Sequence, residues 1–228
     1  MAIWPFTPDL RRRWCLRKAP AGALRDYLAS PFPKPSCDYR QADCLAIDLE
    51  TTGLDPRRDQ ILSVGYVVVH GNRIDLGTAR HRLVRAAYAI PAESAVIHQI
   101  TDDQAAQGES LEPVLADLLA DLAGKVMIAH HATVERGFLD AACRQVFGAP
   151  FVVPVIDTQV VALRTFERRQ TPYKGSDLRL HALSERFNLP RYNAHNALSD
   201  ALAAAELFLA QVAQRDSGRG MPLRDFLS

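Results

Sequence analysis

The segment LAIDLETTG places two carboxylates on one face of an expected strand. Leu45, Ile47 and Leu49 alternate with small or charged residues, as in a strand with one apolar face. Asp48 and Glu50 are two positions apart and therefore point the same way. Two like charges raise each other's proton affinity and cost stability. The pattern therefore predicts a positive group between them.

Composition and charge limit the class of protein. The 228 residues carry a net charge of only +1, so the chain as a whole is not a polycation. Residues 1–40 carry +5, which leaves −4 for the remainder. The four cysteines show neither zinc-site spacing nor the density of a disulfide scaffold. No signal peptide or apolar run of roughly 18 residues is present. These features predict a reduced, cytoplasmic protein with no membrane partner.

Three units are expected along the chain. Residues 1–40 form a basic helical extension with a Pro-rich linker, residues 41–214 the main domain, and residues 215–228 a C-terminal tail. One basic helix is expected between Pro8 and about Ser30. It either docks on the domain through Trp and Leu with Arg facing water, or contacts a partner or nucleic acid. In both cases we expect the large apolar residues Trp4, Phe6 and Trp14 to be buried.

The main domain begins with strands in hairpins and continues with strands that alternate with helices. This order favours an α/β fold with a mixed sheet and helices on both faces. Thr101 and Gln104 form an expected capping box. Strands are expected at 44–50, 61–69, 78–84, 125–132 and 151–158, and helices at 101–124, 135–147, from about 158, at 178–189 and at 195–214.

Further polar residues fall at the ends of these elements. Glu135 lies in the first turn of a helix, where the helix dipole favours it even without catalysis. Asp200 lies among Ala and Leu in a helix that His195 opens, a position that is costly unless the carboxylate is paired or bound to metal. Mg²⁺ prefers such oxygen ligands, and two ions about 4 Å apart can drive phosphoryl displacement. A neighbouring His can accept the proton of the attacking water.

The motifs then identify a family. The stretches AIDLETTGLDPRRDQILSVG, IHQITDDQ, MIAHHATVERGFLDAAC, VIDTQVVA and YNAHNALSDALAAAELF resemble those of the DnaQ-like 3′–5′ exonucleases of the DEDD superfamily. The subgroup is the one whose last motif carries His (DEDDh), and it is similar to the proofreading epsilon subunits of bacterial DNA polymerase III. The resemblance covers residues 43–212 and implies a ribonuclease-H-like fold with a five-stranded mixed sheet, antiparallel in its first three strands and parallel later.

The resemblance also implies roles for individual residues. His195 is the general base, and two Mg²⁺ or Mn²⁺ ions per site are held by four carboxylates. The substrate-binding residues lie in the first motif, before a helix and in the second motif. The metal ligands, which also count as catalytic, are Asp48, Glu50, Glu135 and Asp200, and the substrate-binding residues are Thr51, Thr52, Gly53, His98 and His131.

The second motif departs from the family pattern. Glu135 stands where the family has Asp, and His131 where it has Asn. The extra methylene of Glu moves the carboxylate by more than about 1 Å, which strict Mg²⁺ geometry would register. Two interpretations follow: Glu135 serves as a metal ligand in place of Asp, or the chemistry of the site is impaired or altered. Asp140, five residues further along the helix, points elsewhere.

The expected activity is metal-dependent 3′–5′ hydrolysis of single-stranded DNA or RNA 3′ ends, with DNA favoured and nucleoside monophosphates released. The alternatives are an RNA-trimming, oligoribonuclease-like enzyme and a catalytically weak nucleic-acid-binding module. The loop at 164–179, with its Arg residues, Phe166 and Tyr173, suits single strands or is simply a solvated loop. Residues 1–40 are expected to dock a polymerase partner or a second copy of the chain.

Overall fold

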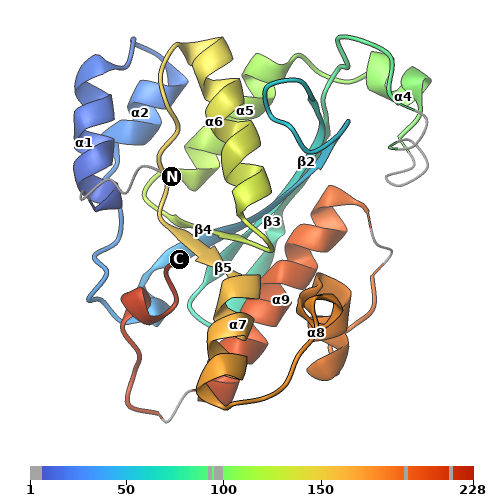
Figure 1. Ribbon diagram of the computed structural model, residues 1–228. Coiled ribbons are helices and arrows are strands. Elements are labelled where there is room, and N and C mark those ends of the chain that lie inside the picture. Colours follow the sequence, from blue (N-terminus) through green and yellow to red (C-terminus); the bar gives the residue numbers. More distant parts are fainter. Residues whose placement is uncertain (1–6, 92–93, 95–99, 193–194, 216–217) are drawn as a thin grey trace.

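A five-stranded mixed sheet forms the centre of the protein. The computed structural model describes residues 7–91, 94, 100–192, 195–215 and 218–228. The strand order is β3-β2-β1-β4-β5; β1 pairs antiparallel with β2 and β2 with β3, whereas β4 runs parallel to β1 and to β5 (Figure 1). The strands are β1 Asp43–Thr51, β2 Ile61–His70, β3 Arg73–Leu83, β4 Val126–Ala129 and β5 Val155–Asp157. The predicted fold class is confirmed.

Each face of the sheet has its own core. Leu45, Ile47 and Leu49 point into the first core, together with residues of the helices on that side. Cys44 and Ala46 point into the second, against the last long helix. Asp48 and Glu50 lie an even number of residues from Cys44 and Ala46, so their side chains point to the same face of the sheet as the second core. The helices are α1 Pro8–Lys18, α2 Ala23–Ala29, α4 Asp102–Ala106, α5 Leu111–Leu122, α6 Thr133–Phe147, α7 Thr158–Arg168, α8 Leu180–Arg186 and α9 Ala197–Arg215.

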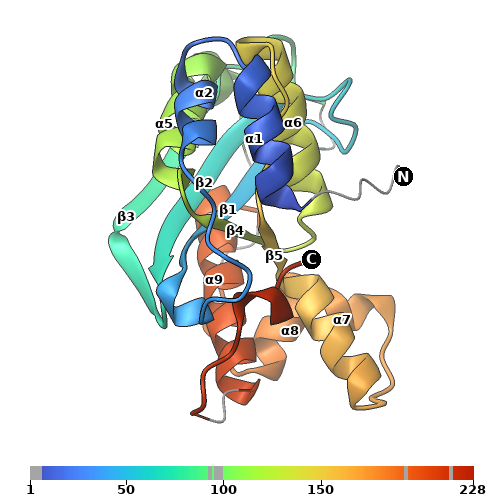
Figure 2. The same cartoon turned by 90° about the vertical axis from the view of Figure 1, so that its left-hand side faces the viewer.

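The helices form two layers around the sheet. Helices α1, α2, α5 and α6 lie on one side, and α7, α8 and α9 on the other (Figures 1 and 2). The expected helix at 101–124 is two helices, because residues around Gly108 pair with the end of β3: the N–H of Glu109 donates to the carbonyl of Leu83. The capping box of Thr101 and Gln104 is present. Within the described residues, no helix is long and apolar enough to span a bilayer.

The N-terminal extension is two helices rather than one. The chain leaves the helical conformation at Ala19, the residue before Pro20, as the steric restriction ahead of proline requires. Leu24, Tyr27 and Leu28 of α2 are buried in the first core with residues of α5 and α6. The extension is therefore docked on the sheet domain.

Two details of the extension differ from expectation. The expectation that arginines face water fails for Arg12, which is buried, forms an ion pair with Asp9 at 2.8 Å and donates to the carbonyl of Leu28. Trp14 is 48% exposed, and Lys18 lies 4.0 Å from its ring centroid. Packing on the domain comes mainly from α2, with Cys15 of α1. Trp14 is not buried on the domain's own surface, and its burial against a partner stays a prediction. Trp4 and Phe6 lie outside the described residues.

The C-terminal segment closes against the Pro-rich linker and the sheet edge. Pro222 forms an isolated antiparallel β-bridge with Asp38, and the N–H of Ser228 donates to the carbonyl of Val155 at 3.0 Å. The ring of Phe226 packs edge-on against Tyr39. Phe226 and Leu223 are part of the second core. The boundaries at residues 40 and 214 stay a prediction, while side chains from all three expected units contribute to shared cores.

Tyr27 provides a test of the docked extension. Its ring is 1% exposed and stacks on Phe151, and its hydroxyl donates to the carbonyl of Val152 at 2.8 Å. Tyr27→Ala should lower the free energy of unfolding by about 3–5 kcal/mol, whereas Tyr27→Phe should cost about 1 kcal/mol. Urea denaturation measures both. Trp14→Ala is the surface control, and an equal loss there would contradict docking through α2.

Candidate active site

Four carboxylates from three elements converge at one end of β1. Asp48 and Glu50 come from β1, Glu135 from the first turn of α6, and Asp200 from the first turn of α9. Ligand atoms of Glu50, His195 and Asp200 all lie within 4.8 Å of one another. Besides burial, the charges of Glu135, Asp200 and Glu50 all raise the pKa of Asp48, so the four carboxylates lie close enough to interact electrostatically. The structure thus brings together the predicted metal ligands.

The electrostatics of this cluster are unfavourable without a cation. Burial, and then the neighbouring carboxylates, hold the pKa of Asp48 well above its ordinary value. Burial and the charge of Asp200 raise the pKa of Glu50 to about 7. Burial raises the pKa of Glu135 to about 8, with the charge of Asp157 adding to it. Burial also raises the pKa of Asp200. The metal-free cluster therefore retains protons near neutral pH.

Close packing of α9 on the sheet brings Asp200 to β1. Asp48 pairs with Gly65 of β2. A Cβ atom at Gly65 would overlap the backbone of Ala197 and Leu198 at the start of α9. Glycine at this position allows the helix to cross the strands in backbone contact, so that its first turn lies beside the carboxylates of β1.

His195 stands just ahead of α9 in a left-handed conformation, with φ 65°. Its N–H donates to Oδ2 of Asp200 at 2.9 Å, which fixes the backbone of one residue to the carboxylate of the other. The side chain is exposed. His195 thus has the access to solvent that a proton acceptor requires.

The loop after β1 is fixed by its own polar groups. Thr52 is buried; its hydroxyl contacts Oδ1 of Asp59 at 3.3 Å and accepts the N–H of Gln60 at 3.1 Å. A Cβ atom at Gly53 would overlap the Asp59 carboxylate. The Thr51 hydroxyl donates to the carbonyl of Gly53 at 2.7 Å. The Thr51 and Thr52 side chains hold the loop, and nucleotide contact by residues 51–53 stays a prediction.

The turn between β4 and α6 carries His131, which has φ 64° and an exposed side chain. Its Nδ1 lies 2.9 Å from Oε1 of Gln159. Asp140 forms an ion pair with Arg144 and accepts the N–H of Phe151, so it does point away from the cluster. His98, the remaining expected substrate-binding residue, lies outside the described residues.

Sequence reasoning assigned no role to Asp157. The residue is buried and accepts N–H groups from both the β4–α6 turn and the start of α7. The available signal was an Asp directly before a helix, which predicts an N-cap but not a contact with a turn 25 residues earlier.

A cleft of about 720 Å³ opens over the carboxylates. Asp48, His195 and Asp200 line it, as do Arg179 and His181 at the start of α8. A cleft that combines carboxylates with cationic and polar groups suits a polyanion that reaches a metal centre.

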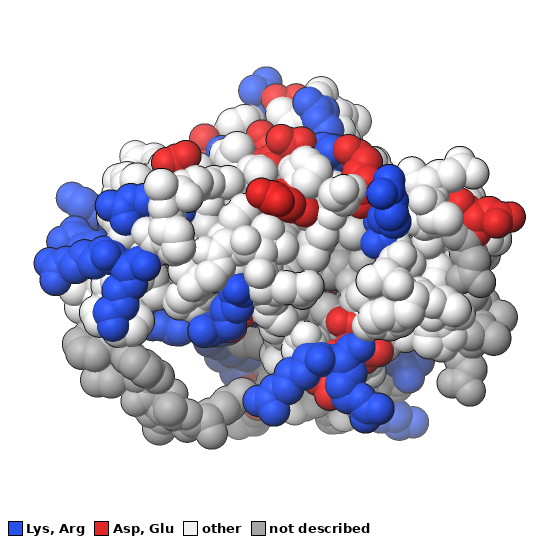
Figure 3. Space-filling view, turned by 90° about the horizontal axis from the view of Figure 1, so that it is seen from above, with Lys and Arg blue, Asp and Glu red and all other residues white. Residues whose placement is uncertain are grey.

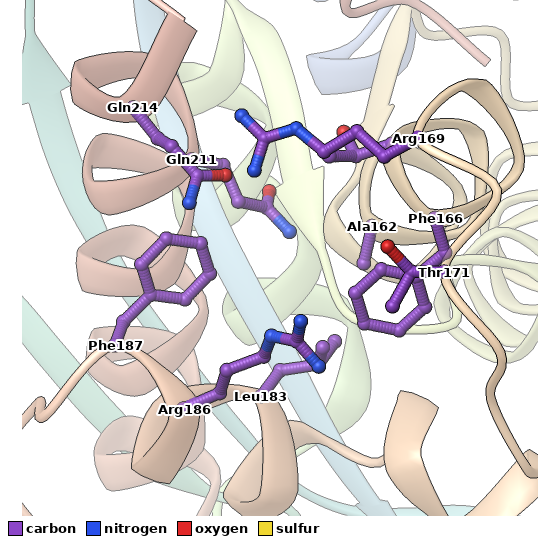
Figure 4. Close-up of a pocket in the computed structure, with 10 residues that line it drawn as sticks. Ala162, Phe166, Arg169, Thr171, Leu183, Arg186, Phe187, Gln211 and Gln214 are labelled. Carbon is purple, nitrogen blue, oxygen red and sulfur yellow. The ribbon is translucent and has the colours of Figure 1, made fainter.

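The two aromatic residues at 164–179 differ in exposure, since Phe166 on α7 is buried and Tyr173 is exposed. Phe166 is 5% exposed, with the Arg186 guanidinium 4.7 Å and the Tyr173 ring 5.7 Å from its centroid. Figure 4 shows Phe166 and Arg186 beside a small pocket between α7, α8 and α9, which Gln211 also lines. Phe166 is therefore covered within the protein, and the interpretation of the 164–179 segment as a single-strand contact stays a prediction.

Comparison with known proteins identifies the family. A family model described as "Exonuclease" matches residues 45–208. The chain belongs to this exonuclease family, RNase_T, as the DnaQ-like motifs predicted. It is 30% identical over 176 residues to DNA polymerase III subunit epsilon of Treponema pallidum, which covers 77% of this chain and 79% of that protein.

Other relatives share the domain in different settings. DNA polymerase III PolC-type of Thermotoga maritima is 30% identical over 171 residues, 75% of this chain but only 12% of that protein. E. coli Exonuclease I in complex with a dT13 oligonucleotide superposes with a TM-score of 0.67 at 17% identity, covering 77% of this chain and 42% of that one. The nuclease domain of 3′hExo, a DEDDh family member bound to rAMP, gives 0.66 at 16%, covering 81% and 98%. These two structures show the shared fold.

The raised carboxylate pKa values predict how stability depends on pH. The unfolded chain releases these protons near pH 4.5, whereas the metal-free folded protein holds them up to about pH 7–8. Stability should therefore fall as pH rises through this window, because the folded state binds more protons. Asp48→Asn removes one ionisable carboxyl group from the cluster and should raise the metal-free Tm at pH 8 by roughly 2–4 °C or more, with less gain at pH 5.

Calorimetry in EDTA measures this effect at both pH values. Asp140→Asn is the matched control because its carboxylate is paired with Arg144 outside the cluster. A lower metal-free Tm for Asp48→Asn at pH 8 would mean that the carboxylates do not repel one another.

Proposed function

We propose that the chain is a divalent-metal-dependent 3′–5′ exonuclease. It hydrolyses terminal phosphodiester bonds of single-stranded nucleic acid, with DNA favoured, and releases nucleoside monophosphates. The observation that carries the proposal is the convergence of Asp48, Glu50, Glu135 and Asp200, with His195, at one end of β1, beside a cleft that Asp48, Asp200 and His195 line.

The residues present fit a pair of hard divalent ions. Oε2 of Glu135 is buried and has no hydrogen-bond partner among the described residues. An orphaned carboxylate oxygen in a cluster of raised pKa is the donor that a cation would satisfy. The set consists almost entirely of carboxylate oxygens, which favours Mg²⁺ or Mn²⁺ over softer metals. The unpartnered oxygen of Glu135 thus supports its role as a metal ligand at the position where the family has Asp.

Each group then has a distinct task. Asp48, Glu50, Glu135 and Asp200 would hold two ions, which when bound supply a more acidic water and stabilise the leaving oxygen. His195 accepts the proton of the attacking water at the open side of the cluster. Residues 51–53 and His131 lie at the ends of β1 and β4, where a terminal nucleotide would lie.

The net charge of only +1 supports a small footprint on the strand. On the face shown in Figure 3, the described Lys and Arg side chains occur in separate groups, interrupted by acidic and uncharged residues. A protein that tracks a long strand needs a continuous basic groove. Within the cleft, Arg179 would meet the terminal phosphates, as would Arg191 on release from its ion pair with Glu185.

DNA as the favoured substrate and a polymerase partner rest on the relatives. One is named as an epsilon subunit of DNA polymerase III, and E. coli Exonuclease I was solved with dT13. The rAMP in the 3′hExo domain makes RNA trimming the second candidate.

The deciding experiment uses matched single-stranded DNA and RNA oligonucleotides labelled at the 5′ end, with Mg²⁺, Mn²⁺ or EDTA. The proposal expects a ladder of products shortened stepwise from the 3′ end, faster on DNA, and none in EDTA. Faster shortening of RNA would select the trimming enzyme. Metal binding and strand binding with no shortening would make the chain a binding module and overturn the proposal.

His195 gives the corresponding mutational prediction. His195→Ala should lower kcat on the order of 10²–10⁴-fold, since a positioned proton acceptor contributes that much, while Mn²⁺ affinity measured by calorimetry changes little. His81→Ala, on β3, is the control and should match the wild type. An equal collapse of Mn²⁺ affinity would make His195 a ligand, a role its place in the cluster also permits.

A further inference from the structure

Asp157, at the end of β5, has no free oxygen with which to bind a metal. Its Oδ1 accepts the N–H groups of His131 at 3.1 Å, Gln159 at 2.9 Å and Val160 at 3.4 Å. Its Oδ2 accepts the N–H of Ala132 at 3.0 Å. These donors occupy the roughly four lone-pair sites of a carboxylate. Asp157 is also 6% exposed, so its carboxylate is committed to backbone groups of two segments.

Side-chain contacts also tie the β4–α6 turn to α7: His130 Nδ1 lies 2.8 Å from Thr158 Oγ1, and His131 Nδ1 lies 2.9 Å from Gln159 Oε1. The backbone N–H groups of His131 and Ala132, however, donate to the Asp157 carboxylate. His131 adopts φ 64°, a left-handed conformation that a residue with a Cβ adopts only when its surroundings impose it. The N-cap of α6 is Ala132, whose side chain cannot accept a hydrogen bond. Asp157 therefore supplies from β5 the charged acceptor that α6 lacks in its own sequence.

The same turn sets the position of Glu135. Helix α6 begins at Thr133, and Glu135 lies in its first turn with the unpartnered Oε2 described above. Ala132 also accepts the N–H of Arg136 at 3.0 Å, so the residue held by Asp157 is part of the first helical turn. A shift of the turn would move the Glu135 carboxylate relative to β1.

We propose that Asp157 is a positioning residue, which sets Glu135 for metal binding through the N–H groups of His131 and Ala132. The inference rests on the proposed function, since it assigns Glu135 a metal ion to bind. Outer residues that orient metal ligands typically change metal affinity or activity by 10–100-fold when replaced.

Asp157→Asn is the test variant. A carboxamide has one acceptor oxygen, so either Ala132 or the other three donors lose their partner and face an NH₂ group. The Mn²⁺ dissociation constant from calorimetry should rise about 10–100-fold, and the Mn²⁺ concentration for half-maximal hydrolysis should rise in parallel. The KM for a short oligonucleotide at saturating Mn²⁺ should stay within about threefold of the wild type, an order-of-magnitude bound for an indirect effect.

Asp140→Asn is the matched control. Asp140 is also an α6-associated carboxylate that accepts a backbone N–H, that of Phe151, but it lies outside the cluster. This variant should lower the metal-free Tm and leave Mn²⁺ affinity unchanged. If Asp157→Asn behaves in the same way, Asp157 is only structural and the inference is overturned.

A double-mutant cycle with Glu135→Gln tests the route of the effect. If Asp157 acts through Glu135, the loss of Mn²⁺ affinity caused by Asp157→Asn should largely disappear in the Glu135→Gln background. An undiminished loss would overturn the positioning role. If Asp157→Asn does not fold, hydrogen exchange of the wild type decides: the amides of residues 131–136 should gain protection with Mg²⁺, and unchanged exchange rejects the inference.

Failure of the inference can be separated from failure of the proposed function. Wild-type protein that binds no Mn²⁺ and shortens no strand contradicts the proposed function itself. Wild-type protein that binds Mn²⁺ and hydrolyses DNA, with Asp157→Asn matching it in both, contradicts only the positioning role.

Discussion

The burial of four neighbouring carboxylates is the constraint around which this structure is arranged. Burial raises the pKa values of Asp48, Glu50, Glu135 and Asp200, and the charges of neighbouring cluster carboxylates raise those of Asp48 and Glu50 further. Such a cluster opposes folding unless surrounding packing holds it together or a cation neutralises it. The two cores on either side of the sheet supply that packing, and Oε2 of Glu135 has no hydrogen-bond partner among the residues that the structure describes.

Two contacts outside the cluster fix its geometry. Gly65 allows the first turn of α9 to touch the backbone of β2, and this contact brings His195 and Asp200 over β1. Asp157 joins the end of β5 to the turn that begins α6, and so fixes the segment that carries Glu135. Each contact acts through backbone atoms, which explains how side chains from distant segments share one site with little freedom.

Local patterns in the sequence predicted much of this architecture. The alternation at Leu45, Ile47 and Leu49 identified β1 and the shared face of its carboxylates, and the motifs predicted the five-stranded sheet and which residues meet. What escaped prediction depends on tertiary contacts. Periodicity and charge do not reveal that Tyr27 rather than Trp14 packs into the core, or that Phe166 is covered by Arg186. The contact of Asp157 with a turn far along the chain is likewise invisible in its own neighbourhood.

The docking of α9 over Gly65 also bears on when the site comes into existence. Its two halves, β1 and the first turn of α9, lie near opposite ends of the sheet domain in sequence, so their meeting is among the most non-local events in folding. During synthesis, β1 leaves the ribosome long before His195 and Asp200 are made. The proposed site can thus form only after nearly the whole domain has been translated, so under the proposed function a partly made chain would lack hydrolytic activity.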